Sequence, residues 1–191
     1  MLADLVRRCR TCRRYRAERA VSHATLDELV DLARLTASAA NKQPLRYLLC
    51  CDAERNALVF PHLRWAAYLT DWDGPAPVER PAAYIILLGD REVSPQVRWD
   101  DAIAAYTIML GAAERGLGAC IFASIARDEL RASLAIPERY EILLAVALGE
   151  PAETVVIDEV GLDGDIRYWR DAAQVHHVPK RRLEDVIVEF G

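Results

Sequence analysis

Two arginines and a threonine near the start of the chain have the chemistry to bind an anion. They lie in CRTCRRYR, residues 9–16, where a helix would place Arg10, Thr11 and Arg13 within one turn. Two guanidinium groups with a hydroxyl between them match the oxygens of a phosphate monoester. The same pattern also fits a solvated basic face that only keeps the chain soluble. The spacing therefore leaves a phosphate site and a plain surface both open.

The stretch SAANKQPLRY, residues 38–47, is a second candidate for ligand binding. Its alanines leave room for a ligand to approach the backbone, and its polar side chains include Ser38, Asn41 and Gln43. The amide groups of Asn and Gln offer both hydrogen-bond donors and acceptors. Pro44 then directs the chain into a predicted strand. We expect this stretch to hold a polar ligand.

Three aromatic residues recur at helical spacing in PHLRWAAYLTDW, residues 61–72. A helix here would place Trp65, Tyr68 and Trp72 on one face. These rings could be ordinary core. Because a Pro-rich loop, residues 74–81, follows them, they could instead lie over a planar ligand.

A second basic group follows two adjacent histidines late in the chain. It consists of Lys180, Arg181 and Arg182, and it could supply further phosphate ligands or lie on the surface. Side chains of adjacent residues on an extended chain point to opposite sides. His176 and His177 are therefore expected to have a structural or anion-facing role rather than to share one metal ion.

The five cysteines do not have the spacing of a disulfide framework. Cys9 and Cys12 form a CxxC pair, and Cys50 and Cys51 are adjacent, but neither pair has a convincing second pair for zinc. Cys120 lies in an apolar stretch and is expected to be a small core residue. We expect free thiols, with a redox role of either pair left open.

Composition and charge limit the classes of function that this chain can have. The 191 residues have a net charge of −5, yet residues 1–19 carry +5, so the acidic remainder carries −10. A basic arm on an acidic body favours local anion binding over the coating of a nucleic acid. No apolar run approaches the roughly 20 residues that span a bilayer, and the first residues lack the apolar region of a secretory signal. We expect a cytoplasmic protein with no membrane or nucleic-acid partner.

The elements that must position these residues can be read from hydrophobic periodicity. Helices are predicted at the start of the chain, after a capping box at Thr25 and Glu28, over residues 61–72, from Asp100 to a stop at Gly116, and over residues 126–134. Strands are predicted over residues 47–51, 82–90, 119–124, 140–150 and 185–190, and the rest of the last thirty residues is expected to be irregular. The GxG of GLGAC closes a helix and enters a strand, so it is not a dinucleotide fingerprint. One α+β domain over residues 1–191 is the prediction.

Five short motifs follow one another in a specific order along the chain. They are CRTCRRY (9–15), ASAANKQP (37–44), WDDAIA (99–104), GLGAC (116–120) and ALGEP (147–151). In this order they resemble the nitroreductase-like family of FMN-dependent oxidoreductases over nearly the whole chain. The chain departs mildly from that pattern at Ala37, where the family has proline, and at Ala102, where it has glycine. The last thirty residues match the family least.

The resemblance implies a three-layer α+β fold, with a central, mostly antiparallel sheet flanked by helices and a long central helix at a homodimer interface. It implies FMN as the cofactor, with NADH or NADPH as a transient electron donor. No catalytic side chain is implied, because the flavin carries the chemistry, and no metal is implied. The positions that match the family's cofactor contacts are Arg10, Thr11, Arg13, Ser38, Asn41, Gln43, Ala123, Ser124, Lys180 and Arg181. Trp65, Tyr68 and Trp72 are our candidates for a wall of the substrate pocket.

The expected activity is reduction of an electron-poor small molecule, such as a nitroaromatic, a quinone or a flavin, in two hydride-transfer steps. The sequence does not choose between NADH and NADPH or name the acceptor. Reductive dehalogenation and oxidative breakdown of flavin are alternatives on the same scaffold. From other classes, the chain could be a non-catalytic module that binds through its arginine-rich arm, or a flavin-binding protein without turnover.

Overall fold

A computed structural model describes residues 1–189 of the chain and divides it into two compact units. The larger unit contains residues 1–64 and 75–152, and the smaller unit contains residues 65–74 and the chain from residue 153 onward. Each unit has a sheet of its own. The expectation of a single domain over residues 1–191 stays a prediction.

The larger unit is built on a four-stranded sheet with the strand order β1-β2-β4-β3. The strands are β1 (Leu45–Cys50), β2 (Ala83–Asp90), β3 (Gly118–Phe122) and β4 (Tyr140–Gly149). All three pairings are antiparallel. Strand β2 is buried along its whole length, in keeping with its apolar sequence up to Leu88, because helices cover both of its faces.

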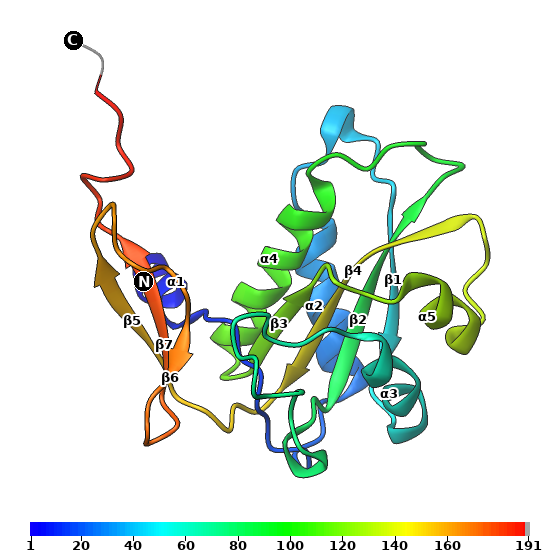
Figure 1. Ribbon diagram of the computed structural model, residues 1–191. Coiled ribbons are helices and arrows are strands. Elements are labelled where there is room, and N and C mark those ends of the chain that lie inside the picture. Colours follow the sequence, from blue (N-terminus) through cyan, green and yellow to red (C-terminus); the bar gives the residue numbers. More distant parts are fainter. Residues whose placement is uncertain (190–191) are drawn as a thin grey trace. The chain divides into compact units, whose positions relative to one another are not determined.

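Helices form the outer layers of this unit. Helices α2 (His23–Arg34) and α4 (Asp100–Glu114) cover one face, and α3 (Ala53–Val59) and α5 (Arg127–Leu134) lie on the other (Figure 1). On the first face, alternate residues of β2 pack into one core with residues of α2 and α4, as the period-two geometry of a strand requires. The predicted α+β class and three layers are confirmed. A short helix, α1 (Leu2–Arg8), begins the chain.

The local signals for helices were read correctly at some ends and wrongly at others. Helix α4 ends where expected, since Gly116 has a φ of 74° that favours glycine. Helix α2 begins three residues earlier than the predicted capping box, because Ser22 is the N-cap and its hydroxyl accepts from the Thr25 N–H. Helix α3 was missed, although Asp52 caps it by accepting from the Arg55 N–H.

The helix predicted over residues 61–72 is wrong. The chain makes a short 3₁₀ turn, η2 (Phe60–His62), and residues 63–72 then follow turns and irregular backbone. Leu63 pairs instead with Ile125 in an isolated antiparallel bridge. Helical spacing of the aromatic residues misled the sequence reading. Two further 3₁₀ turns are η1 (Ala39–Asn41) and η3 (Pro77–Glu79).

The smaller unit contains a three-stranded sheet with the order β5-β7-β6. Its strands are β5 (Val155–Val160), β6 (Trp169–Arg170) and β7 (His176–Arg181). Strands β6 and β7 lie within the last thirty residues, so the expectation that these residues are irregular is wrong there. Strand β5 precedes them and was not predicted, although VVIDEV is rich in β-branched residues. The strand predicted over 185–190 is not formed by residues 185–189, and Phe190 lies outside the described residues.

Across residues 1–189, the structure contains no helix whose length and apolar composition would let it cross a membrane. The five cysteines, all within the described residues, are thiols that form no disulfide bond, in line with the prediction.

Candidate functional site

The arginine-rich motif after α1 is extended rather than helical. Helix α1 ends at Arg8, and Thr11 then pairs in a parallel bridge with Ala119 of β3. The Cys12 N–H donates to the carbonyl of Ala119 over 2.9 Å. Strand β3 is at the edge of its sheet, so its unpaired backbone groups can capture this segment. Arg10, Thr11 and Arg13 therefore do not share a helical turn, which was one way in which they could have met at a phosphate.

Two glycines of the later motifs make room for this segment. A Cβ built on Gly118 would lie 2.7 Å from the Cβ of Cys12, and one built on Gly149 would lie 2.9 Å from Cδ1 of Tyr15. The Tyr15 N–H also donates to the Glu79 carbonyl over 2.9 Å. The motifs CRTCRRY, GLGAC and ALGEP therefore depend on one another through packing.

The arginines of this segment have different surroundings. Arg14 pairs with Glu79 through contacts of 2.6 and 2.9 Å, and both side chains are mostly buried. The Nη2 of Arg10 donates to the Val6 carbonyl over 2.7 Å, while its buried Nε has no hydrogen-bond partner among residues 1–189. An unpartnered guanidinium N–H that is shielded from water calls for an acceptor. Arg10 is thus suited to an anion, and Arg14 holds the segment in place.

Residues 38–44 form a tight polar loop, called here the 38–44 loop, between α2 and β1. Ala40, Asn41 and Gln43 all have φ values of 51–52°, in the left-handed region that residues other than glycine rarely occupy. Such backbone persists only where the surroundings determine it, and it is frequent at ligand sites. The side chain of Gln43 donates through Nε2 to Asn41 Oδ1 over 3.2 Å. The two predicted amide side chains therefore lie together, and both are exposed.

Asp100, the first residue of α4, supports the start of the 38–44 loop. This buried carboxylate accepts from the Ser38 hydroxyl over 2.5 Å and from the Ala39 N–H over 3.0 Å. The Ser38 oxygen in turn accepts from the Gln43 N–H over 2.9 Å. The hydroxyl of Ser38 is thus engaged inside the loop, and Asp100 is a residue that the sequence reading did not assign to the site.

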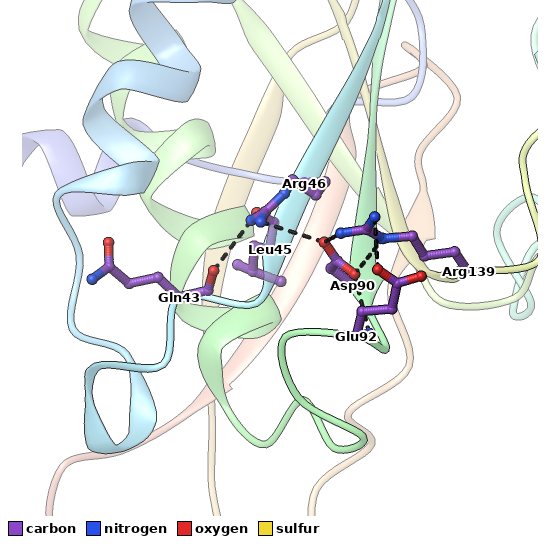
Figure 2. Close-up of polar contacts among 6 residues, drawn as sticks. All are labelled: Gln43, Leu45, Arg46, Asp90, Glu92 and Arg139. Atoms are coloured by element: carbon purple, nitrogen blue, oxygen red, sulfur yellow. Dashed lines mark hydrogen bonds and ion pairs between the residues drawn. The ribbon is translucent and has the colours of Figure 1, made fainter.

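An ion-pair network supports the end of the loop (Figure 2). Arg139 binds the fully buried Asp90 with two parallel contacts of 2.8 and 2.7 Å, and Arg46 contacts Asp90 over 3.3 Å. Arg46 also donates to the carbonyls of Gln43 and Leu45. Hydrogen bonds from Arg139 hold the pKa of Asp90 below its ordinary value, so its carboxylate stays charged. Sequence reasoning missed this network, because a charge at the end of an apolar strand does not reveal its partners.

A cavity of about 190 Å³ lies beside the 38–44 loop, and Ser38, Gln43, Tyr47 and Asp100 are among its lining residues. Burial, helped by the negative charge of Asp100, raises the pKa of Tyr47 to about 12. The phenol therefore stays protonated at neutral pH and can donate a hydrogen bond into the cavity.

Ala123 and Ser124 are exposed and follow directly after β3. The Ala123 carbonyl accepts from Arg127 over 3.1 Å, and the Ser124 carbonyl accepts from the Arg64 N–H over 3.1 Å. In a planar trans peptide the N–H points away from the carbonyl. The Ser124 N–H therefore points away from Arg127. It is a backbone donor of the kind that the sequence analysis expected near Ala123 and Ser124.

The predicted aromatic residues lie in the smaller unit. Trp65 and Trp72 make an edge-to-face pair with centroids 6.1 Å apart, although the residues between them are not helical. Arg170 lies 4.3 Å over the Trp72 ring and pairs with Glu153 over 3.1 Å. Trp72 is therefore part of a packed cluster. The half-exposed Tyr68 packs against Tyr168.

The late basic and histidine residues also belong to the smaller unit. Lys180 is exposed on β7, and Arg181 donates to the carbonyls of Gly161 and Leu162. His176 is buried, and His177 contacts Asp158 over 2.9 Å. Within residues 1–189 no cluster of three or more His, Cys, Asp or Glu side chains could hold a metal. The assignment of Lys180 and Arg181 to a phosphate stays a prediction.

Comparison with known proteins identifies the family. A model described as the nitroreductase family matches residues 6–150. A crystal structure of a nitroreductase-like protein in complex with FMN from Desulfovibrio desulfuricans is 25% identical, with a TM-score of 0.64 over 80% of this chain and 87% of that one. An FMN-dependent nitroreductase from Clostridium difficile R20291 is 23% identical, with a TM-score of 0.63 over 80% and 88%. A further FMN complex from Exiguobacterium sibiricum is 16% identical, with a TM-score of 0.67 over 80% and 89%.

The chain belongs to the nitroreductase family. The resemblance carried by the five motifs is therefore confirmed for the family and for the fold of residues 6–150.

Proposed function

We propose that this protein is an FMN-dependent oxidoreductase that takes electrons from NADH or NADPH and passes them to an electron-poor small molecule. Membership of the nitroreductase family supports this proposal, as do the similar structures from Desulfovibrio desulfuricans and Exiguobacterium sibiricum that contain FMN. When bound, FMN supplies the capacity to accept and donate a hydride.

The observation that carries the proposal is the donor chemistry of the arginine-rich segment. The buried Nε of Arg10 has no partner among the described residues, and the segment around it is fixed to β3. A phosphate provides the acceptor that this donor needs, and a charge-assisted hydrogen bond is stronger than a neutral one. Arg10, Thr11 and Arg13 would thus hold the phosphate end of FMN.

The other predicted contacts of the larger unit suit a flat ring with several heteroatoms. Asn41 and Gln43 offer donors and acceptors from a backbone that is already fixed. Ser38 would support them from inside the 38–44 loop. A backbone N–H near Ala123 and Ser124 would stabilise negative charge on the ring. We assign no catalytic side chain.

We also propose that the protein acts as a homodimer. Ile103 and Tyr106 on α4 are each 40% exposed and lie one turn apart, and Trp99 before the helix is 67% exposed. Residues three apart on a helix share a face, so these side chains offer apolar area for a second copy. Sedimentation equilibrium tests this point. The role of Trp65, Tyr68 and Trp72 as a wall of the acceptor pocket stays a prediction.

The first experiment is an absorption spectrum of the purified protein, repeated after denaturation to identify the released chromophore. The proposal expects a flavin spectrum and released FMN. Anaerobic addition of NADH or NADPH should then bleach the flavin band. A colourless protein that also fails to take up added FMN would remove the proposed function. A salt-sensitive binding module would then account better for the arginine-rich arm.

A further inference from the structure

Arg46 holds the end of the 38–44 loop. It binds backbone carbonyls there, not the side chains that are predicted to contact the cofactor. Arg46, on β1, donates through Nη1 to the carbonyl of Leu45 over 2.8 Å and to that of Gln43 over 3.2 Å. The Asp90 N–H donates to the Pro44 carbonyl over 2.8 Å. Arg46 thus binds the carbonyls of Gln43 and Leu45 (Figure 2). The carbonyl between them, of Pro44, is bound by the backbone of Asp90.

The buried carboxylate of Asp90 fixes the direction of Arg46. The side chain of Arg46 is 44% exposed, and without a partner it would sample many rotamers in solvent. Its Nη2 lies 3.3 Å from Asp90 Oδ2, and this contact restricts it. Asp90 is itself held by Arg139, whose Nη1 also pairs with Glu92 over 2.8 Å. A side chain whose partners are already ordered loses less entropy when it makes a further bond. The network therefore makes Arg46 a rigid clamp on the loop.

The loop needs such a clamp because its backbone is unfavourable. Ala40, Asn41 and Gln43 are all left-handed without being glycine, and each such residue costs free energy that the surroundings must offset. Asp100 secures the start of the loop through Ser38 and Ala39. Gln43 lies nearest to the clamp, since its own carbonyl is one of the groups that Arg46 binds.

We propose that Asp90, acting through Arg46, is a positioning residue that holds the 38–44 loop in the form that presents Asn41 and Gln43 to the cofactor. This inference rests on the proposed function for the identity of the ligand. The part of the proposal that concerns structure, namely that Asp90 and Arg46 order the loop, does not depend on any ligand.

The chain offers a specific probe of the loop, because its only two lysines are Lys42 and Lys180. Lys42 is exposed within the loop, and Lys180 lies on β7 of the smaller unit. A protease that cuts after lysine therefore reports the opening of the loop by cleavage after Lys42. Cleavage after Lys180 serves as an internal control in the same sample, and mass spectrometry separates the two.

The test compares Arg46→Met with Arg55→Met. Arg55 is a matched control because it is also exposed and follows the other end of β1. Among residues 1–189, the contacts of its side chain are weak, at 3.8 Å to Asp52 and 3.5 Å to the Leu49 carbonyl. In flavin-free protein, Arg46→Met should raise the rate of cleavage after Lys42 about tenfold, the effect of losing one charge-assisted hydrogen bond. Cleavage after Lys180 and the melting temperature should match those of Arg55→Met.

Titration with FMN tests the second half of the proposal. Arg46→Met should weaken FMN binding about tenfold, while turnover at saturating FMN stays at the wild-type level. That separation distinguishes positioning from a general loss of structure. Asp90→Asn should produce the same loop opening together with a lower melting temperature, because it also breaks the Arg139 pair.

Two results would overturn the proposal. Wild-type cleavage after Lys42 in Arg46→Met would show that the clamp does not order the loop. Faster cleavage with unchanged FMN affinity would show that the loop does not hold the cofactor. If the wild-type protein itself binds no FMN, the proposed function fails, and the cleavage rates still decide whether Asp90 and Arg46 order the loop.

Discussion

The ring of Tyr15 fills the space that a side chain at residue 149 would occupy, since a Cβ on Gly149 would lie 2.9 Å from Tyr15 Cδ1. Tyr15 is fully buried, and its hydroxyl donates to the Cys12 carbonyl. Tyr15 also bridges to Pro151. Gly149 in β4 thus leaves the space in which Tyr15 packs, and this packing holds the N-terminal segment that carries Arg10 and Thr11.

Gly149→Ala should therefore destabilise the fold by about 1–3 kcal/mol, the usual cost of overpacking a core. The added methyl group must displace the Tyr15 ring or the strand. Gly161→Ala is the control, because nothing lies within 4 Å of a Cβ at that position, and it should change stability by less than about 0.5 kcal/mol. Urea unfolding of the two variants gives both numbers. Equal stabilities would contradict the packing role of Gly149.

Removal of Arg10 should affect the cofactor more than the fold. Arg10→Ala removes a charge-assisted contact to phosphate of about 1.5–3 kcal/mol, so the protein should purify largely without flavin. Arg13→Ala should do the same. Arg8→Ala, an exposed change in α1, should leave flavin content at the wild-type level. The measurement is the ratio of flavin to protein absorbance, and full flavin in both Arg10→Ala and Arg13→Ala would show that the phosphate assignment is wrong.

Arg14→Ala should affect the stability of the fold more than the flavin content, the reverse of Arg10→Ala. Arg14 and Glu79 are about four-fifths buried and pair over 2.6 Å, so loss of the guanidinium leaves a carboxylate without this partner in a poorly solvated place. We expect a loss of stability of about 1–3 kcal/mol. Thermal unfolding with FMN in excess measures it, and Arg16→Ala is the control, because the Arg16 contact with Glu150 is exposed and contributes about 0–1 kcal/mol. Similar losses in both variants would contradict a supporting role for Arg14.

Periodicity predicted the strands and long helices of the larger unit, whereas their arrangement in three layers was implied by the family resemblance. The apolar run of β2 and the glycine stop after α4 are local signals that the fold obeys. The helix over residues 61–72 failed because aromatic spacing alone does not distinguish a helix from a turn-rich segment whose rings meet. For the site, the motifs singled out Arg10 and the 38–44 loop, and their role in binding stays a prediction. The supporting residues Asp90, Asp100 and Arg139 could not be assigned from the sequence, since the pairs Arg46–Asp90, Asp90–Arg139 and Ser38–Asp100 are between 44 and 62 positions apart in the chain.

Cys50 should make the stability of the protein fall at alkaline pH. Burial raises the pKa of its thiol from an ordinary value of 9.0 to about 11, so the folded chain keeps a proton that the unfolded chain loses. Between these values the unfolded state binds fewer protons, and the free energy of unfolding decreases as the pH rises. The contribution is fully present below pH 9 and is lost as the pH approaches 11. Across this window it is on the order of 1–3 kcal/mol.

Cys50→Ala tests this linkage, because alanine has no proton to lose and the thiol is completely buried. Its stability at neutral pH should be lower, since a small cavity replaces the sulfur atom, yet it should fall less steeply between pH 9 and 10.5 than that of the wild type. Urea unfolding at a series of pH values provides the curves. Cys51→Ala, a change at the half-exposed neighbour, should keep the wild-type slope. Parallel curves for Cys50→Ala and the wild type would mean that the Cys50 thiol ionises as easily in the folded protein as in the unfolded chain.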